Sequence, residues 1–529
     1  MRAPNFLLFV TDQQRADQLG CYGDPVRSTP HIDRLAAEGQ LFEEFHVATP
    51  ICQPNRASLM TGRLPSAHGV QMNGRELSFG ERTFVQSLRE AGYSTALVGK
   101  SHLQNITAVP PIWPAGSQRL SHDARQVFPG IYGQEVGKRW EDDPAFELTL
   151  PYYGFESVCL TIGHGDEQQG HWRRWLRQQT PEAEQLIGPH NAIPTPNSRL
   201  ALLRQAWRTR LPEELYPTRY IADRTCDALT AQATGGQPFF IQCSFPDPHH
   251  PFTPPGRYWD QYKAQDMQLP ESFHAQLTDP PPAIEWLRQA RISQPQAKPG
   301  YGAFACDEHE AREAMALNHG SMACIDDAIG RVMSRLSELG LSDNTVVMFT
   351  SDHGELLGDR GLMFKGGLHY QALTRVPFIW RDTAEQRSTQ QPGHRRQALA
   401  QTTDIAATVL ARAGIGATHG MHGRSLLGLM TGSDSAVREH LLIEEESQRQ
   451  DFGLQTRMRL LTLRTRRHRL TIYDGQVWGE LYDLQEDPLE LHNLWNDAGA
   501  LPLRNALALQ MSQASLAARD TSPYPTASA

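Results

Sequence analysis

The chain has 529 residues, which is long enough for one large domain with a smaller appendage or for two or three ordinary domains. Its net charge is −9, and its 39% hydrophobic and 21% charged residues are typical of a globular protein. It has no basic tract and no apolar run near the roughly 20 residues of a membrane helix, so neither nucleic acid nor a membrane is an expected partner. Its seven cysteines lack paired spacing, and the apolar run at residues 6–10 is too short for a signal peptide, which predicts a cytoplasmic location.

The first predicted strand, residues 5–10, is a continuous apolar run typical of a buried parallel strand. Asp12 and Gln13 follow at its carboxyl end, where open α/β sheets bind ligands. Asp12 is therefore a candidate metal ligand, with the amide oxygen of Gln13 beside it, and an Asp-initiated turn is the alternative. Residues 29–39 predict a helix capped by Thr29 and ended by a glycine.

The stretch 49–63, TPICQPNRASLMTGR, predicts a loop that runs into a helix beginning near Cys52. Pro54 suits a first turn, and a glycine can end the helix at residue 62. Free N–H groups and the dipole at a helix N-terminus favour negative charge, and Arg56 lies one turn further on. A nucleophile, a positive helix end and an arginine suit a tetrahedral oxyanion. A buried structural cysteine is the alternative.

Cys-x-Pro-x-Arg followed by Ala-Ser-Leu-Met-Thr-Gly-Arg resembles the signature of the type I sulfatases of the alkaline phosphatase superfamily, near its arylsulfatase, choline-sulfatase and phosphonate monoester hydrolase branch. The resemblance implies that Cys52 is oxidised to formylglycine, the catalytic nucleophile. It also implies a formylglycine-generating enzyme as a maturation partner. Asn55 stands where serine or alanine is commoner in the family.

Two further candidates follow the cysteine helix. Asn73 is a candidate hydrogen-bond donor to a substrate oxygen, and a turn asparagine before glycine is about equally expected. Residues 94–98 predict a strand that delivers Lys100 and His102, and Gly-Lys-x-His resembles the family's pair of substrate-facing cations. A surface lysine and a turn histidine are the alternative.

Residues 105–215 are crowded with proline, tryptophan and turn residues and are predicted to be an insertion over the strand ends, either a lid or a subunit contact. An ordinary peripheral subdomain is the alternative. His164 and His171 could reach a ligand from here, but isolated histidines are usually surface residues. We expect a homo-oligomer, a dimer or a tetramer.

Two more predicted strands lead into motifs similar to those of the family. Residues 238–244 are followed by Pro-His-His-Pro at residues 248–251. The resemblance assigns His249 to the leaving group, with His250 as its neighbour. Residues 345–350, a β-branched apolar run, deliver Asp352 and His353, and Lys365 follows in a Lys-Gly pair.

Alternating strands and helices, among them predicted helices at residues 311–339 and 402–410, predict a mostly parallel sheet flanked by helices. From residue 431 the pattern changes to that of a small antiparallel sheet. The resemblance implies an alkaline-phosphatase-like α/β fold, with a catalytic domain at residues 1–430 and a C-terminal subdomain at residues 431–529.

By this resemblance the protein is a sulfuric ester hydrolase that acts on a small anionic sulfate monoester. One divalent cation would be held by Asp12, Gln13, Asp352, His353 and the residue derived from Cys52. A nitrogen ligand fits manganese or zinc better than calcium, and calcium stays among the alternatives. The implied roles are oxyanion stabilisation by Arg56 and Lys100, contact of Lys365 with the transferred group, protonation of the leaving oxygen by His249, and a basic role for His102.

Two other classes remain open. Phosphonate monoester and phosphodiester hydrolases of the superfamily share formylglycine and an Asp-His metal pair but tend to lack the Lys-x-His motif, and one enzyme can accept both ester types. A catalytically inactive binding protein would show gaps in the constellation, and the sequence shows none.

Overall fold

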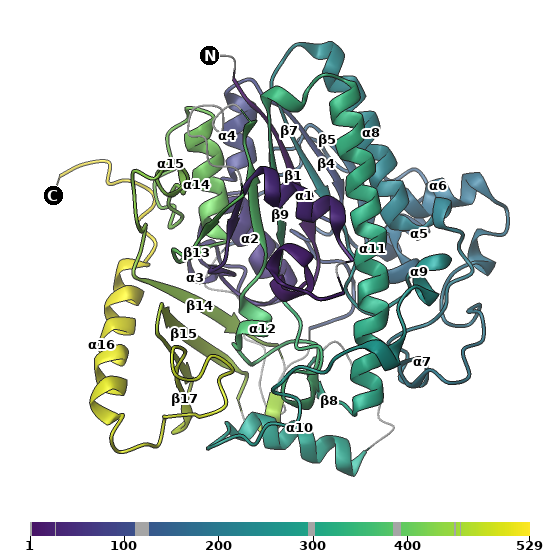
Figure 1. The fold of residues 1–529 in the computed structure, drawn as a ribbon. Helices are drawn as coiled ribbons and strands as arrows, with labels where there is room; N and C mark the ends of the chain where they lie inside the picture. Colours follow the sequence, from purple (N-terminus) through teal and green to yellow (C-terminus); the bar gives the residue numbers. More distant parts are fainter. Residues whose placement is uncertain are drawn as a thin grey trace.

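A computed structural model describes residues 3–26, 28–111, 126–294, 302–383, 393–448, 451–454 and 456–528. Its centre is a nine-stranded sheet in the order β12-β2-β11-β9-β1-β7-β4-β5-β6 (Figure 1). Strands β9, β1, β7, β4 and β5 are mutually parallel, whereas β11 and β6 run antiparallel to their neighbours. The predicted large and mostly parallel sheet is confirmed.

The strands are β1 Asn5–Thr11, β2 Gln40–Phe42, β3 Phe45–His46, β4 Ser94–Gly99, β5 Ser157–Ile162, β6 Gln169–Gly170, β7 Phe239–Ser244, β8 Phe304–Ala305, β9 Thr345–Ser351, β10 Leu362–Met363, β11 Phe378–Arg381, β12 His394–Arg396, β13 Ala400–Gln401, β14 His440–Glu446, β15 Arg459–Thr465, β16 His468–Tyr473 and β17 Gly479–Asp483. The helices are α1 Pro30–Glu38, α2 Cys52–Thr61, α3 Pro65–His68, α4 Phe84–Glu90, α5 Gly137–Asp142, α6 His171–Gln179, α7 Arg199–Leu202, α8 Pro217–Gly235, α9 Arg257–Asp260, α10 Pro282–Ser293, α11 Glu308–Glu338, α12 Gln371–Thr374, α14 Thr403–Arg412, α15 Leu427–Thr431 and α16 Leu501–Ala517.

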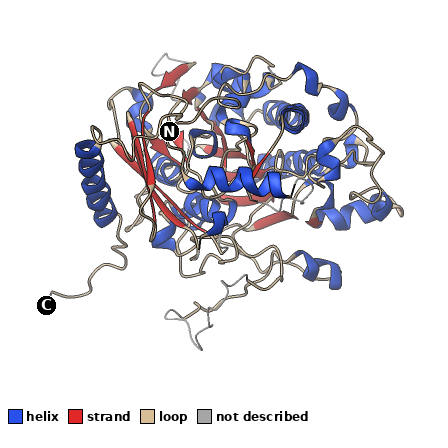
Figure 2. Cartoon of the chain, turned by 90° about the horizontal axis from the view of Figure 1, so that it is seen from below, coloured by secondary structure: helices blue, strands red, loops and turns tan. Residues whose placement is uncertain are grey.

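Helices cover both faces of the central sheet (Figure 2). Along β1, Phe6 and Leu8 belong to one core with α2, α4 and α14, while Leu7 and Phe9 belong to a second core with α1, α8 and α11. Successive side chains of a strand point to opposite faces, so a continuous apolar strand needs a helical layer on each side. The central strands are therefore buried, and polar residues that follow them meet at one edge of the sheet.

Thr29 occupies the N-cap position of α1, as predicted, but its side chain makes no cap hydrogen bond. The hydroxyl of Thr29 accepts a hydrogen bond from Gly20 and donates to Asp33. The carboxylate of Asp326, on α11, instead accepts from the N–H groups of His31 and Ile32 at 3.0 and 2.8 Å. A residue nearly 300 positions away thus satisfies the first turn of α1.

The described part of residues 105–215 adds structure to the central sheet as well as covering it. It supplies β5, which pairs with β4, and β6 at the sheet edge. Residues 112–125 of the predicted insertion lie outside the described residues. Whether the segment acts as a lid or a subunit contact stays a prediction.

The C-terminal part forms a four-stranded antiparallel sheet, β14-β15-β16-β17, as predicted. Helix α16 packs against it, shown in yellow in Figure 1. Across the residues that the structure describes, no helix is long and apolar enough to cross a membrane.

Candidate active site

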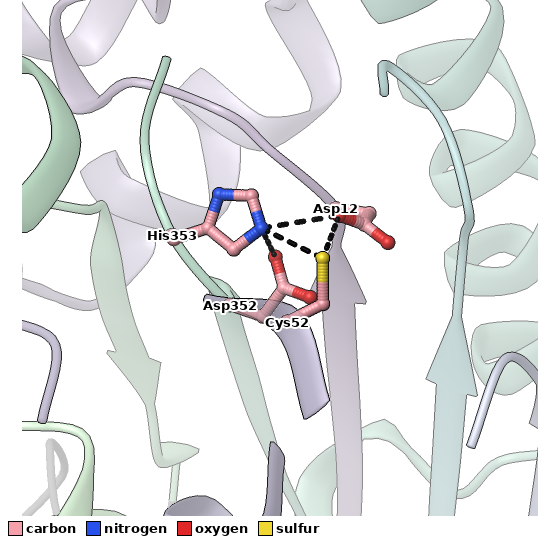
Figure 3. Close-up of side chains that lie close together, drawn as sticks. All are labelled: Asp12, Cys52, Asp352 and His353. Atoms are coloured by element: carbon pink, nitrogen blue, oxygen red, sulfur yellow. Dashed lines mark hydrogen bonds and ion pairs between the residues drawn. The ribbon is translucent and has the colours of Figure 1, made fainter. Parts of the chain in front are cut away.

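Three chain segments far apart in sequence meet where the central strands end (Figure 3). Asp12 follows β1, and Asp352 and His353 follow β9, whose final residue pairs with Thr11. Cys52 is the first residue of α2 and faces them, as the sequence predicts. Parallel pairing in register is what brings the residues after β1 and β9 together.

These four side chains offer ligand atoms that all lie within 4.8 Å of one another. The sulfur of Cys52 lies 3.0 Å from Nε2 of His353 and 3.6 Å from Oδ1 of Asp12. Nε2 of His353 is 3.5 Å from a carboxylate oxygen of both Asp12 and Asp352. All four residues are buried, and two carboxylates with an imidazole are a donor set that fits a divalent cation.

Gln13 lies in the same place but faces several partners. Its backbone has a φ of 62°, and its N–H donates to Asp352 at 3.1 Å. Its side-chain oxygen accepts from Lys365 at 2.6 Å, and its side-chain nitrogen contacts Glu355 and lies 3.0 Å from Nδ1 of His250. The amide is thus tied into the site, and its role as a metal ligand stays a prediction.

Three buried cations surround the cluster. Arg56 donates to Asp352 at 2.7 Å and to the hydroxyl of Ser244 at 2.9 Å. Nζ of Lys365 lies 3.1 Å from the sulfur of Cys52, and Nζ of Lys100 binds Asp12. The site therefore concentrates positive charge in an acidic protein, as recognition of an anion requires.

Asn55 connects α2 to the neighbouring loops by hydrogen bonds. Its side-chain nitrogen donates to the carbonyl of Asp352 at 2.5 Å and lies 3.3 Å from the hydroxyl of Thr402, and its side-chain oxygen accepts from Ala48. Serine or alanine would be too short to make all three contacts. This asparagine therefore fixes the helix that carries Cys52 to the loop that carries Asp352.

The histidines form a column of stacked rings. His249 stacks on His250 with centroids 4.2 Å apart and on His164 with centroids 3.7 Å apart. Nε2 of His249 accepts from Lys365 at 2.9 Å. His164, expected on the surface, belongs to the site, whereas His171 binds Leu160 and Glu147 away from it. His164 comes just after β5. Ligands bind beyond the carboxyl ends of strands, and this strand-end rule would have indicated His164 if β5 had been predicted.

His102 and Asn73 are held near the site by main-chain contacts. His102 is buried with a φ of 57°, and its N–H donates to Glu135 at 2.6 Å. Among the described residues its Nδ1 has no hydrogen-bond partner. Asn73 is exposed, and its side-chain oxygen accepts from the N–H of Gln53, next to the cysteine.

Nearby positive charges favour the ionised forms of Asp12 and of the Cys52 thiol. Burial alone would raise the pKa of Asp12, but Lys100 above all the other neighbours holds it well below its usual value. Burial and Asp12 oppose ionisation of the Cys52 thiol, while Lys365, His353 and Lys100 outweigh them and lower its pKa. The site thus stabilises negative charge at position 52.

The pKa values of three histidines are lowered as well, which for an imidazole favours the neutral form. Burial, then the charge of Lys100, lowers the pKa of His164 to about 4. Burial, followed by His164 and Lys365, holds the pKa of His249 well below its usual value. Burial and Lys100 do the same for the pKa of His102. All three rings are therefore neutral near pH 7 in this arrangement.

Comparison with known proteins agrees with this geometry. A family model described as Sulfatase matches residues 4–415, and one described as N-sulphoglucosamine sulphohydrolase, C-terminal, matches residues 358–517. The chain is 27% identical to an arylsulfatase of Clostridium perfringens over 93% of its own length and 90% of that protein. It is 30% identical to a multifunctional alkaline phosphatase superfamily protein, PehA, of Trinickia caryophylli over 84% of this chain and 80% of that one.

Among solved structures, a phosphonate monoester hydrolase of Agrobacterium radiobacter superposes with a TM-score of 0.77 at 24% identity, covering 98% of this chain and 96% of that one. This likeness shows the fold, which is alkaline-phosphatase-like. Because the sulfatase model spans most of the sequence, the chain belongs to the sulfatase family of the alkaline phosphatase superfamily.

Proposed function

We propose that this sulfatase-family hydrolase cleaves a sulfate monoester, with Cys52 converted to formylglycine as its nucleophile. The observation that carries the proposal is the buried cluster of Cys52, two carboxylates and His353 at the start of α2, ringed by Arg56, Lys100 and Lys365. The aldehyde of formylglycine at position 52 would add water to form a gem-diol. One hydroxyl would attack sulfur as the alcohol leaves, and loss of the proton from the second hydroxyl would release sulfate and restore the aldehyde. Production of the active protein would need a formylglycine-generating enzyme.

One divalent cation, manganese or calcium with zinc as a further option, would be held by Asp12, Asp352 and His353, with Gln13 beside them. Such a cation lowers the pKa of an oxygen ligand and polarises the ester oxygens. The donor set supports this assignment, because two buried carboxylates and an imidazole whose ligand atoms lie within 4.8 Å of one another suit a divalent cation.

The lysine, arginine and histidine side chains of the site would bind the ester and transfer protons. Arg56 and Lys100, both buried, would hold the negative oxygens of the ester, and Lys365 would contact the transferred group. His249 would give a proton to the leaving oxygen. His102, neutral and with a free Nδ1 in the described structure, suits a base in the release of sulfate. Asn73 would donate to a substrate oxygen from the rim.

Hydrolysis of phosphonate monoesters or phosphodiesters, alone or alongside sulfate esters, is the second candidate. The Asp352–His353 pair is shared with such enzymes, and the PehA relative is described as multifunctional. Lys100 and His102 favour the sulfatase, because those enzymes tend to lack the Lys-x-His motif.

Side-by-side kinetics test the choice. The formylglycine-containing, metal-loaded protein is assayed on an aryl sulfate, a phosphate diester and a phosphonate monoester of the same leaving group. We expect the highest kcat/KM on the sulfate, the aldehyde mass in the residue-52 peptide, and no turnover by Cys52→Ala. A higher kcat/KM on the phosphonate would favour the second candidate, and substantial activity in Cys52→Ala would rule out the formylglycine mechanism.

A further inference from the structure

His164 contacts three groups of the candidate active site, and none of the roles above uses it. Its Nε2 lies 2.7 Å from Nζ of Lys100 and 3.6 Å from Oδ2 of Asp12, and its ring stacks on His249 with 12° between the planes. Its side chain is 11% exposed, against 1% for Lys100, so it lies between the buried centre and solvent.

The contact with Lys100 fixes the tautomer of His164. A lysine ammonium group has only donors, so the Nε2 that faces it must be the acceptor. In a neutral ring the proton is then on Nδ1. Nζ of Lys100 is therefore held between a carboxylate oxygen of Asp12 and an imidazole nitrogen of His164, and these two acceptors set the direction of the ammonium group.

The contact with His249 fixes a ring plane. His164 and His250 both stack on His249, with 12° and 26° between the planes, and two rings cannot stack on the same face of a third. His249 is therefore held between them, and Phe364 stacks on His250 at 3.5 Å to close the inner end of the column. His164 is the outer end, so without it only the contacts of His249 with the carbonyl of His250 and with Lys365 oppose a tilt of the ring toward solvent.

We propose that His164 is a positioning residue of this active site, which aims Lys100 through a hydrogen bond and holds the ring of His249 by stacking. The proposal rests on the proposed function, since it assumes that Lys100 binds the ester oxygens and that His249 serves the leaving group. It also gives the inserted segment a part in the chemistry, because β5 delivers this residue.

Two substitutions separate the two contacts. His164→Gln keeps an acceptor for Lys100 but removes the stacked ring, and His164→Phe keeps a ring but removes the acceptor. For His164→Phe we expect kcat/KM to fall about 10-fold to 100-fold, as loss of a hydrogen bond to a charged group does, and by a similar factor for good and poor leaving groups. For His164→Gln we expect a loss that grows with the pKa of the leaving alcohol, because only poor leaving groups need a well-placed proton donor.

The matched control is His171→Phe. This histidine belongs to the same inserted segment, where it accepts from the N–H of Leu160 on β5 and contacts Glu147. It should lower stability by an amount similar to the His164 variants and leave the dependence of rate on leaving group unchanged. Kinetics of both His164 variants that match those of His171→Phe or of the unmodified chain would overturn the proposal.

Crystal structures of the two variants give a readout independent of activity. We expect Nζ of Lys100 to leave its place beside Asp12 in His164→Phe, and the ring of His249 to turn in His164→Gln. If the parent protein hydrolyses no ester, the proposed function fails, and these structures still decide the matter for His164. Unmoved Lys100 and His249 would overturn the positioning role.

Discussion

Asp352 illustrates how one residue can serve several partners at once. One carboxylate oxygen accepts from the N–H of Gln13 at 3.1 Å, and the other accepts from Arg56 at 2.7 Å. The first oxygen also lies 3.5 Å from Nε2 of His353, inside the candidate metal cluster. The carboxylate is thus oriented by the chain before any cation binds, which is how outer partners tune a metal ligand.

Replacing Asp352 by asparagine keeps the shape and removes the charge. Loss of outer partners alone weakens metal binding 10-fold to 100-fold, so we expect Asp352→Asn to weaken it by more than about 100-fold. Calorimetric titration of chelator-treated protein with manganese and with calcium measures the effect. Asp359→Asn, which alters a carboxylate bound by Arg15 and Ser272, is the control. Full activity after chelation would contradict a catalytic cation.

His249 poses a question of proton supply. Its Nδ1 faces the carbonyl of His250, and its Nε2 accepts from Lys365, so the neutral ring has a lone pair where the leaving oxygen would need a proton. The ring must therefore be protonated before it can act as the acid, and Lys365 is a donor already in contact.

If His249 is the acid, His249→Ala should cost much more with a poor leaving group than with nitrophenol-type esters. General acid catalysis contributes about 100-fold to 10,000-fold when the leaving group needs it. A plot of log kcat/KM against the pKa of the leaving alcohol should then steepen in the variant. An unchanged slope would mean that another group, such as His250, donates the proton.

At the scale of elements, the strand-end rule accounts for most of what the sequence predicted. Strands β1, β7 and β9 are mainly apolar and buried along their whole length, so the sequence indicates the polar residues that follow them. Strand β5 is exposed at its start and buried only over its last three residues, and it lies among turn-forming residues. It gives no such signal, so the sequence offers no reason to prefer His164, which follows this strand, over an ordinary surface histidine.

Local sequence patterns also do not predict contacts between elements that are far apart in the sequence. The cap on α1 comes from Asp326 of α11, and no pattern within residues 29–39 could show this. The loop of Lys100 and His102 is likewise held from outside. The buried carboxylate of Glu135 accepts from three successive backbone N–H groups, those of residues 102–104.

Asp326 makes stability depend on pH. Burial raises its pKa to about 7, although the N–H groups of His31 and Ile32 oppose the shift. An unfolded aspartate has a pKa of about 3.9, so between about pH 4 and pH 7 the folded state binds more protons than the unfolded state. The free energy of unfolding should therefore fall as pH rises through this window, by up to about 1.4 kcal/mol per pH unit.

Asp326→Asn removes this titration, so its stability should fall less between about pH 4.5 and pH 7 than that of the unmodified chain. Urea unfolding at half-unit pH steps measures the difference. Asp260→Asn, which alters an exposed aspartate that binds Arg208, is the control and should keep the original slope. Parallel curves for Asp326→Asn and the unmodified chain would contradict the assignment.

At the scale of the whole molecule, the C-terminal sheet contacts the loop that carries Lys365 in the candidate active site. Glu445 of β14 accepts from the N–H of Gly367 at 2.8 Å and lies 3.1 Å from His369. Both partners closely follow Lys365, whose ammonium group contacts Cys52. The sequence predicted the second sheet from its alternating pattern, but its contact with the site depends on three-dimensional packing.

A buried ion network ties the same sheet to the catalytic part. Arg469 of β16 donates to Glu490 at 2.5 Å and to Glu480 of β17 at 3.0 Å, and all three residues are at most 2% exposed. Glu490 also accepts from the N–H of Gln371, the first residue of α12. One arginine thus bridges two carboxylates at the junction of the two parts, and Arg360 lies 4.0 Å from Glu490.

Arg469→Met should be severely destabilising, because it leaves Glu480 and Glu490 buried without their arginine. Removing one partner of a buried pair typically costs about 3–5 kcal/mol, whereas an exposed ion pair contributes at most about 1 kcal/mol. Arg467→Met is the matched control, since Arg467 binds Asp483 from a half-exposed position just before β16.

Denaturant unfolding followed by tryptophan fluorescence and by circular dichroism should give a single transition for both variants, shifted strongly only for Arg469→Met. A separate early transition in Arg469→Met would show instead that the C-terminal sheet unfolds independently of the catalytic part.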